Sequence, residues 1–187
     1  KGKPFFLYLP YTSPHKPVIP IKKFLGKSKA GAYGDFMMET DWHVGRILKF
    51  LDDQKLTGNT MVVFTSDNGP EKTWTKRAEL HRHQSNGIYR EGKRSIYEGG
   101  HRVPFFIRWP AKVKAGSTWD EPVCQTDLLA TFAEMVGAKL PPDAGEDSDS
   151  FYMGLLGRKR GLARLPMIHH SSSGRFAIRD GQWKLVM

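Results

Sequence analysis

The sequence of 187 residues contains a single cysteine, Cys124. One cysteine excludes an internal disulfide, and it cannot supply the paired Cys spacing of a structural zinc site. Cys124 lies in a segment with helical spacing, which predicts a small apolar side chain packed in the interior. Cysteine usage therefore excludes a fold that depends on disulfides.

Long apolar runs are also missing. No stretch approaches the roughly 20 apolar residues that a membrane-spanning helix needs, so we expect no membrane span. A composition of 39% hydrophobic and 26% charged residues is typical of a globular chain, and the length indicates one domain. The chain opens at Lys1 and enters a strand-like apolar run at once, which predicts that further polypeptide precedes it in the full protein.

Acidic residues are scarce relative to basic ones. Asp and Glu number 19 against 29 Lys and Arg, which gives a formal net charge of +10. This charge attracts anionic partners over long range. Because the basic residues are dispersed and no zinc-finger, RNP or basic-zipper motif accompanies them, we expect no nucleic-acid partner. Anionic small molecules and sulfated glycans are the favoured partners.

The chain is organised around a buried strand and the turn that ends it. Residues 60–65 are mostly β-branched or aromatic without polar alternation, and residues 66–70 are Ser-Asp-Asn-Gly-Pro. In open α/β sheets, ligands bind beyond the carboxyl ends of strands. Asp67 and Asn68 would place two hard oxygen donors there, which suits Ca²⁺ or Mg²⁺. A turn stabilised by Asx side chains, without a ligand, is the alternative.

A second strand end carries a histidine. Residues 4–9 predict a buried strand, and the following loop holds His15 between Pro14 and Pro17, which restrict the backbone. An imidazole in this place can donate a proton or contact an anion. A surface histidine without a function is the alternative.

Regular spacing of apolar residues predicts a helix over residues 34–55, which residues 57–59 end. Strand, helix and strand in this order predict a βαβ unit with parallel strands and a right-handed crossover. Residues 71–92 are polar without hydrophobic periodicity, which predicts a functional or disordered loop.

The second half of the chain has four further predicted elements. These are a strand at 105–109, a helix at 126–137, a strand at 167–170 and a hairpin turning at Asp180-Gly181. Residues 138–150 are rich in Pro, Gly and acidic residues, which favours a mobile loop or a boundary between subdomains.

The segment from Gly92 to Pro104 combines charge with paired glycines. Gly99 and Gly100 permit a close approach to another group. Glu98 lies between Lys93 and Arg102 in the sequence, which predicts one ion pair among them.

Four motifs together resemble the C-terminal half of a formylglycine-dependent (type I) sulfatase of the arylsulfatase kind. They are residues 13–17 (SPHKP), 66–69 (SDNG), 92–104 (GKRSIYEGGHRVP) and 178–185 (IRDGQWKL). The resemblance implies an α/β fold like that of alkaline phosphatase, with a mostly parallel sheet flanked by helices and a small antiparallel region at the C-terminus. It also implies that residues 1–140 belong to the catalytic domain, here truncated, and that residues 141–187 begin a C-terminal subdomain.

The resemblance also implies roles for four residues. Asp67 and Asn68 match the metal-ligand pair of the family, which holds one divalent cation, usually Ca²⁺. His15 matches the histidine at the leaving-group oxygen, and Lys93 matches the lysine that contacts sulfate. Glu98 and Arg102 are expected to brace the loop of Lys93 without touching the substrate. In this family, a hydrated formylglycine attacks sulfur and the alcohol leaves.

The sequence departs from the family pattern in one respect. Nothing in it fits the Cys/Ser-X-Pro/Ala-X-Arg motif of the nucleophile, and Cys124 is followed by Gln-Thr-Asp. The second pair of metal ligands is also missing, so we expect this chain alone to be inactive and to bind Ca²⁺ weakly. A formylglycine-generating enzyme would be a partner of the full protein. The resemblance implies a periplasmic, secreted or lysosomal location.

Two other functions remain open at this point. A phosphodiester or phosphonate hydrolase of the same superfamily would act on a similar tetrahedral group, although Asn68 in place of a second carboxylate or a histidine favours the less charged sulfate. A non-catalytic binder of sulfated polysaccharide would use the positive charge alone.

Overall fold

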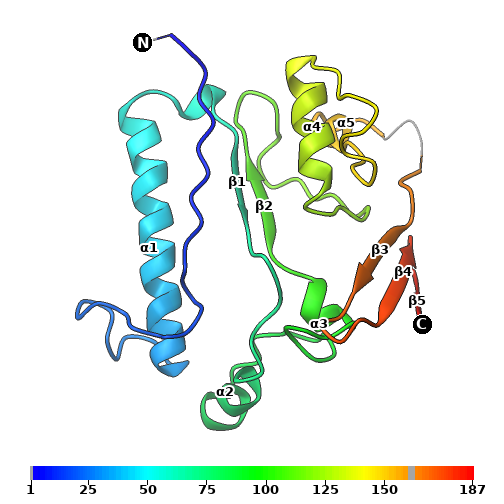
Figure 1. Ribbon diagram of the computed structural model, residues 1–187. Coiled ribbons are helices and arrows are strands. Elements are labelled where there is room, and N and C mark those ends of the chain that lie inside the picture. The colour runs from blue at the N-terminus through cyan, green and yellow to red at the C-terminus, as the bar shows by residue number, and fades with distance from the viewer. Residues whose placement is uncertain (1, 160–162) are drawn as a thin grey trace.

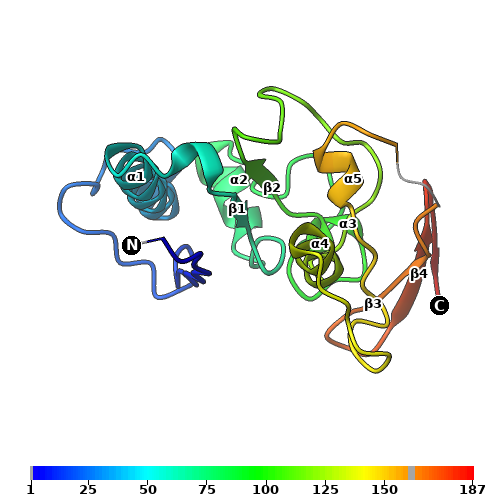
Figure 2. The same cartoon turned by 90° about the horizontal axis from the view of Figure 1, so that it is seen from above.

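The computed structural model describes residues 2–159 and 163–187, which form three groups of elements (Figure 1). A pair of strands lies between one long helix and two shorter helices, and a small sheet lies beyond them, as the view from above also shows (Figure 2). The elements are α1 (Gly31–Asp53), η1 (Thr57–Asn59), β1 (Val62–Thr65), α2 (Trp74–His81), α3 (Glu98–His101), β2 (Phe105–Arg108), α4 (Asp127–Val136), α5 (Tyr152–Leu155), β3 (Met167–His170), β4 (Phe176–Asp180) and β5 (Trp183–Val186).

Helix α1 confirms the periodicity of the sequence, and its buried acidic residues hold the preceding connection. The Asp35 carboxylate accepts hydrogen bonds from the backbone N–H groups of residues 26, 27 and 28 at 2.7–2.9 Å. Glu39 accepts another from the Ile21 N–H at 2.9 Å. The basic connection before α1 is therefore folded against the helix.

The central strands correct one predicted feature. β1 pairs with β2 in antiparallel register, with Val62 opposite Arg108 and Thr65 opposite Phe105. Both sheets in the described part of the chain are antiparallel, so the parallel pairing expected of residues 4–9 and β1 is not formed.

Residues 4–9 are extended but are not a strand, contrary to the prediction. Side chains 5–9 are 46–80% exposed, and these residues have no strand partner in the described part of the chain. The segment runs beside α1 in the same direction as β1 (Figure 1). The predicted burial is wrong as well, because apolar composition alone does not bury a segment, and a strand also needs a neighbour that completes its backbone hydrogen bonds.

Helix α2 was not predicted. It occupies the first half of the polar stretch 71–92, which lacks the apolar stripe of a packed helix. It contacts α1 through a cation–π interaction, in which the Arg77 guanidinium lies 3.7 Å from the centre of the Tyr33 ring. Arg77 also donates to Ser85 Oγ at 3.1 Å and to Thr73 Oγ1 at 3.2 Å. Polar contacts therefore stabilise a helix that hydrophobic periodicity does not reveal.

The C-terminal elements agree with the sequence. β3, β4 and β5 form an antiparallel sheet in that order, and the predicted hairpin is confirmed by the pairing of Asp180 with Trp183. Helix α4 ends at Gly137, which has φ +69°, a backbone conformation that glycine adopts without strain. None of the helices in the described residues is long and apolar enough to cross a membrane.

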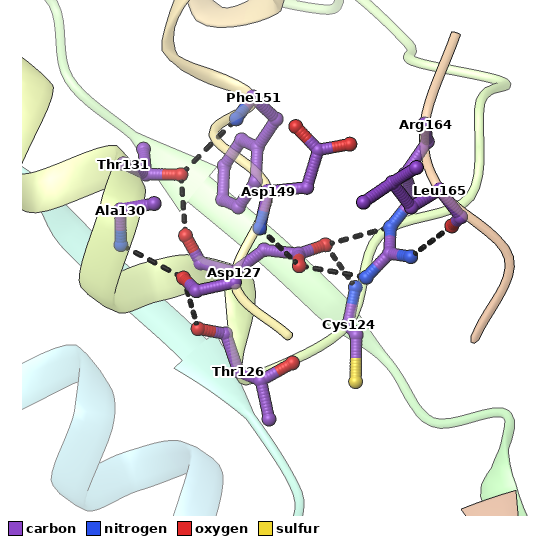
Figure 3. Close-up of polar contacts among 10 residues, drawn as sticks. Cys124, Thr126, Asp127, Ala130, Thr131, Asp149, Phe151, Arg164 and Leu165 are labelled. Carbon is purple, nitrogen blue, oxygen red and sulfur yellow. Dashed lines mark hydrogen bonds and ion pairs between the residues drawn. The ribbon is translucent and has the colours of Figure 1, made fainter. Parts of the chain in front are cut away.

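A buried ion pair fastens α4 to the segment that follows it (Figure 3). The Asp127 carboxylate, fully buried, accepts from Arg164 Nη2 at 2.7 Å and Nε at 3.0 Å. It also accepts from the N–H groups of Cys124 at 2.8 Å and Asp149 at 3.0 Å. Phe151 N–H donates to the buried Thr131 hydroxyl at 3.1 Å. The end of the Pro- and Gly-rich stretch, residues 148–150, is thus tied to α4, while the division into domains at residue 140 stays a prediction.

We predict that Asp127→Ala lowers the free energy of unfolding of the full-length protein by about 3–5 kcal/mol, because it leaves the buried Arg164 guanidinium without its carboxylate. Denaturant unfolding monitored by fluorescence measures the change. Asp53→Ala is the matched control, since Asp53 pairs with Lys49 on the surface, and its effect should stay below about 0.5 kcal/mol. Equal losses in the two variants would contradict the importance of the buried pair.

Candidate functional site

Backbone hydrogen bonds join the turn after β1 to the segment around Lys93, which lies 23 or more residues further along the chain. Gly69 N–H donates to the Gly100 carbonyl at 3.0 Å, and Lys93 N–H donates to the Pro70 carbonyl at 2.8 Å. A Cβ at Gly69 would lie 1.7 Å from the Gly99 carbonyl oxygen, so no larger residue fits there. The turn of Asp67 and Asn68 and the turn of Lys93 are therefore held together.

The glycines on either side of Lys93 also lie so close to other backbone atoms that no larger residue fits. A Cβ at Gly92 would lie 2.5 Å from the Pro70 carbonyl oxygen, and one at Gly99 would lie 2.0 Å from the Glu91 carbonyl oxygen. These close approaches confirm the role that the sequence predicted for the paired glycines.

Asp67 and Asn68 present oxygen atoms at the carboxyl end of β1. The Asp67 carboxylate is exposed and has no hydrogen-bond or ion-pair partner in the described part of the chain. Asn68 Nδ2 donates to the Gly69 carbonyl at 2.9 Å, which leaves its Oδ1 as an acceptor. Such oxygen atoms fit a hard divalent cation.

Two donors do not complete a calcium site, which takes six to eight oxygen ligands. Among residues 2–159 and 163–187, no cluster of three or more His, Cys, Asp or Glu side chains could hold a metal ion. Asp67 and Asn68 therefore fit such an ion as one part of its coordination shell, and their role as ligands stays a prediction.

Lys93 is half buried, and its ammonium group has no partner in the described residues, whereas its neighbour is firmly paired. Arg94 Nη1 binds both oxygens of Glu71, at 2.7 and 2.9 Å. The hydrogen bond from Arg94 and that from the Lys72 N–H lower the pKa of Glu71 to about 2. Since Glu71 is neutralised by Arg94, the charge of Lys93 is available for an anion.

His15 lies on a separate loop. Ser13 in this loop accepts a hydrogen bond from Thr40 of α1 at 2.6 Å, and His15 Nδ1 lies 2.7 Å from the Lys16 carbonyl oxygen. The charge of Lys16 in this loop contributes to the lowered pKa of Glu71. Within the described chain, no hydrogen bond or ion pair joins the exposed His15 ring to Asp67, Asn68 or Lys93.

The four predicted residues line one hollow of about 3380 Å³. Since ligand pockets measure roughly 300–1,000 Å³, lining this hollow does not by itself bring side chains to one ligand. The backbone bonds bring together the two turns that carry Asp67, Asn68 and Lys93, and His15 lies on a separate loop. Their catalytic roles stay predictions.

The structure adds contacts that the sequence did not predict. Gln125, in the turn before α4, donates its amide Nε2 to the Ser66 carbonyl and so supports the start of the Asp67 turn. Glu98 binds Arg179 and Lys184 of the C-terminal sheet, while Arg102 is 4.0 Å away, and in the described residues no ion pair joins Glu98 to Lys93. The sequence predicted an ion pair of Glu98 with Lys93 or Arg102, but Glu98 pairs mainly with residues far away in the sequence. No local sequence signal marks either contact.

Comparison with known proteins decides the family. Residues 1–138 match the Sulfatase family. The chain belongs to the sulfatase family. It is 40% identical over its full length to N-acetylgalactosamine-6-O-sulfatase of Bacteroides thetaiotaomicron, of which it covers 37%. It is 38% identical over 94% of its length to human steryl-sulfatase, of which it covers 30%.

Solved structures agree with this family assignment. A Bacteroides thetaiotaomicron structure, described with the metabolism of multiple glycosaminoglycans, superposes with a TM-score of 0.87 at 39% identity and covers all of this chain and 39% of that one. Ps i-CgsB in complex with k-i-k-neocarrahexaose gives 0.84 at 29% identity, covering all of this chain and 42% of that one. The alkaline-phosphatase-like fold class is confirmed, and the chain spans about two fifths or less of these sulfatases.

We predict that Gly69→Ala separates the two turns, because its Cβ would collide with the Gly99 carbonyl. The free energy of unfolding of the full-length protein should fall by about 1–3 kcal/mol or more, measured by denaturant unfolding. Gly45→Ala is the control: its Cβ meets nothing within 4 Å, and alanine favours helix α1, so stability should stay or rise. A neutral Gly69→Ala would contradict the tight contact.

Proposed function

We propose that the full-length protein containing this chain hydrolyses sulfate esters. The observation that carries the proposal is the backbone connection between the Asp67-Asn68 turn and the Lys93 turn. It joins two oxygen donors to a free ammonium group in a chain that belongs to the sulfatase family. This combination suits a tetrahedral oxyanion, which needs positive charge on several sides.

Lys93 would bind the sulfate group directly. An ammonium group stabilises the charge that builds on sulfate oxygens in the transition state, and it does so best where the protein holds it in place beforehand. The Lys93 backbone is fixed by its bond to Pro70, and its charge is not used by Glu71 or Glu98.

Asp67 and Asn68 would hold a divalent cation, with Ca²⁺ the expected ion, together with ligands from outside this chain. When bound, such a cation supplies Lewis-acid stabilisation of the sulfate oxygens. A formylglycine outside this chain, made by a formylglycine-generating enzyme, would supply the nucleophile.

His15 would donate a proton to the leaving-group oxygen, so that it departs as an alcohol. An imidazole can transfer a proton near neutral pH, which a poor alkoxide leaving group requires. Its position on a loop that is anchored to α1 and that lines the same hollow as Asp67, Asn68 and Lys93 supports this role.

We propose a sulfated sugar as the substrate. Its support is the net charge of +10, which attracts a polyanionic glycan, and the similarity to N-acetylgalactosamine-6-O-sulfatase and to a protein solved in complex with k-i-k-neocarrahexaose. Human steryl-sulfatase is similar over almost as much of the chain, so steroid sulfates are the comparison substrates.

We predict that the full-length protein, matured with a formylglycine-generating enzyme, releases sulfate from an aryl sulfate in the presence of Ca²⁺. Lys93→Ala and Asp67→Ala should each lower kcat/KM by about 10²–10³-fold, since each removes stabilisation of the transition state. Lys112→Ala, on an exposed lysine of the turn after β2, is the control and should leave kcat/KM unchanged.

The outcomes separate the alternatives. A preference for the matching aryl phosphate would place the protein among the phosphodiester or phosphonate hydrolases. No turnover of either ester, with retained binding of sulfated polysaccharide, would make it a non-catalytic binder. Unchanged turnover in Lys93→Ala would overturn the role given to that lysine. Faster cleavage of steroid sulfates than of sulfated sugars would overturn the proposed substrate.

A further inference from the structure

The Glu98 carboxylate is held by two cations from the C-terminal sheet. Arg179 Nη1 lies 3.0 Å from Oε2, and Lys184 Nζ lies 2.9 Å from Oε1. The three side chains are only 28%, 20% and 12% exposed, respectively. Solvent screens such a cluster less than an ordinary surface ion pair. Its bonds therefore hold the segment of Glu98 at a fixed position on the C-terminal sheet.

The same sheet contacts the backbone between Lys93 and Glu98. Lys184 Nζ also donates to the Ile96 carbonyl at 2.6 Å. The Ser172 N–H, in the turn between β3 and β4, donates to the Arg94 carbonyl at 3.1 Å. Residues 94, 96 and 98, alternate positions directly after Lys93, are therefore all bonded to the C-terminal sheet.

On its other side, this segment is bonded to the turn after β1. Lys93 N–H donates to the Pro70 carbonyl at 2.8 Å, and Gly99 N–H closes the loop on the Arg90 carbonyl at 2.9 Å. Arg94 has φ +77°, a conformation that non-glycine residues rarely adopt, so the chain turns sharply directly after Lys93. Lys93 therefore lies at a sharp turn that is bonded on one side to the C-terminal sheet and on the other to the turn after β1. A shift of either partner would move Lys93.

The charges of the side chains around Glu98 also favour its ion pairs with Lys184 and Arg179. Burial raises the pKa of Glu98, but the hydrogen bond from Lys184 and the nearby Arg179 and Arg102 outweigh it and hold the pKa below its ordinary value. The His101 and His169 rings pack with centroids 4.5 Å apart between α3 and β3. Burial lowers the pKa of both, that of His169 to about 4, so neither adds positive charge beside Lys184 near neutral pH.

We propose that Lys184 and Arg179, through Glu98 and the Ile96 carbonyl, position Lys93 for sulfate, so that the C-terminal sheet is a working part of the active site. The proposal rests on the proposed role of Lys93. Lys184 and Arg179 are positioning residues, because they act on the segment that carries Lys93 and not on the substrate.

Hydrogen–deuterium exchange of the full-length protein tests the anchoring without any assumption about activity. Lys184→Met keeps the length of the side chain and removes its bonds to Glu98 and Ile96. Exchange in peptides covering residues 92–100 should become about tenfold faster or more. Lys49→Met, which removes the exposed pair with Asp53 on α1, is the control and should leave this segment unchanged.

A double-mutant cycle tests whether the anchoring acts through Lys93. Lys184→Met should lower kcat/KM for an aryl sulfate by about 10–100-fold, the loss expected from a displacement of about 1 Å. In a Lys93→Ala background, the same substitution should have little further effect, because the group that it positions is gone. Lys184→Arg, which keeps the charge and the donors, should retain most of the activity.

Wild-type exchange rates at residues 92–100 in Lys184→Met would overturn the anchoring. An equal loss of kcat/KM with and without Lys93 would show a general structural role and overturn the positioning of Lys93. Glu98→Gln serves for both measurements if Lys184→Met does not fold, since it keeps the side-chain volume and weakens both ion pairs. A wild-type protein without sulfatase activity would overturn the proposed function, whereas the exchange experiment would still test the anchoring.

Discussion

The contact between Gly69 and the Gly99-Gly100 pair is the constraint on which the rest of this structure depends. Two backbones approach more closely than any side chain at Gly69 would permit, and the Gly69 N–H binds the Gly100 carbonyl. The approach fixes the turn after β1 against the turn of Lys93 before any ligand is bound. A site for a charged group benefits from such preorganisation, because its own charged groups are already in place and need not rearrange when the ligand binds.

The neighbouring charges are arranged so that Lys93 keeps its own. Glu71 is neutralised by Arg94, and Glu98 is neutralised by Arg179 and Lys184, so neither of these two carboxylates takes up the charge of Lys93. A lysine that formed an ion pair with either carboxylate would be a structural group. The pairing scheme therefore connects the packing of the C-terminal sheet to the chemistry proposed for the turn.

Local patterns in the sequence predicted the elements that depend on local order, such as α1, α4 with Gly137 at its end, and the hairpin at Asp180-Gly181. The motifs also placed Asp67, Asn68 and Lys93 at the two turns that the structure joins. Features that depend on distant partners were missed or wrong. Residues 4–9 have the composition of a buried strand but pair with no strand in the described part of the chain, α2 is held by polar contacts, and Glu98 pairs with residues more than 80 positions away.

A crystal structure of the full-length protein with Ca²⁺ and inorganic sulfate tests the central claim most directly. The account predicts oxygen atoms of Asp67 and Asn68 at about 2.3–2.6 Å from one Ca²⁺. It also predicts that Lys93 Nζ lies within about 3.2 Å of a sulfate oxygen, with the Gly69–Gly100 bond intact. A Ca²⁺ ion bound away from the turn after β1, or Lys93 turned away from the sulfate to pair with a carboxylate, would contradict it.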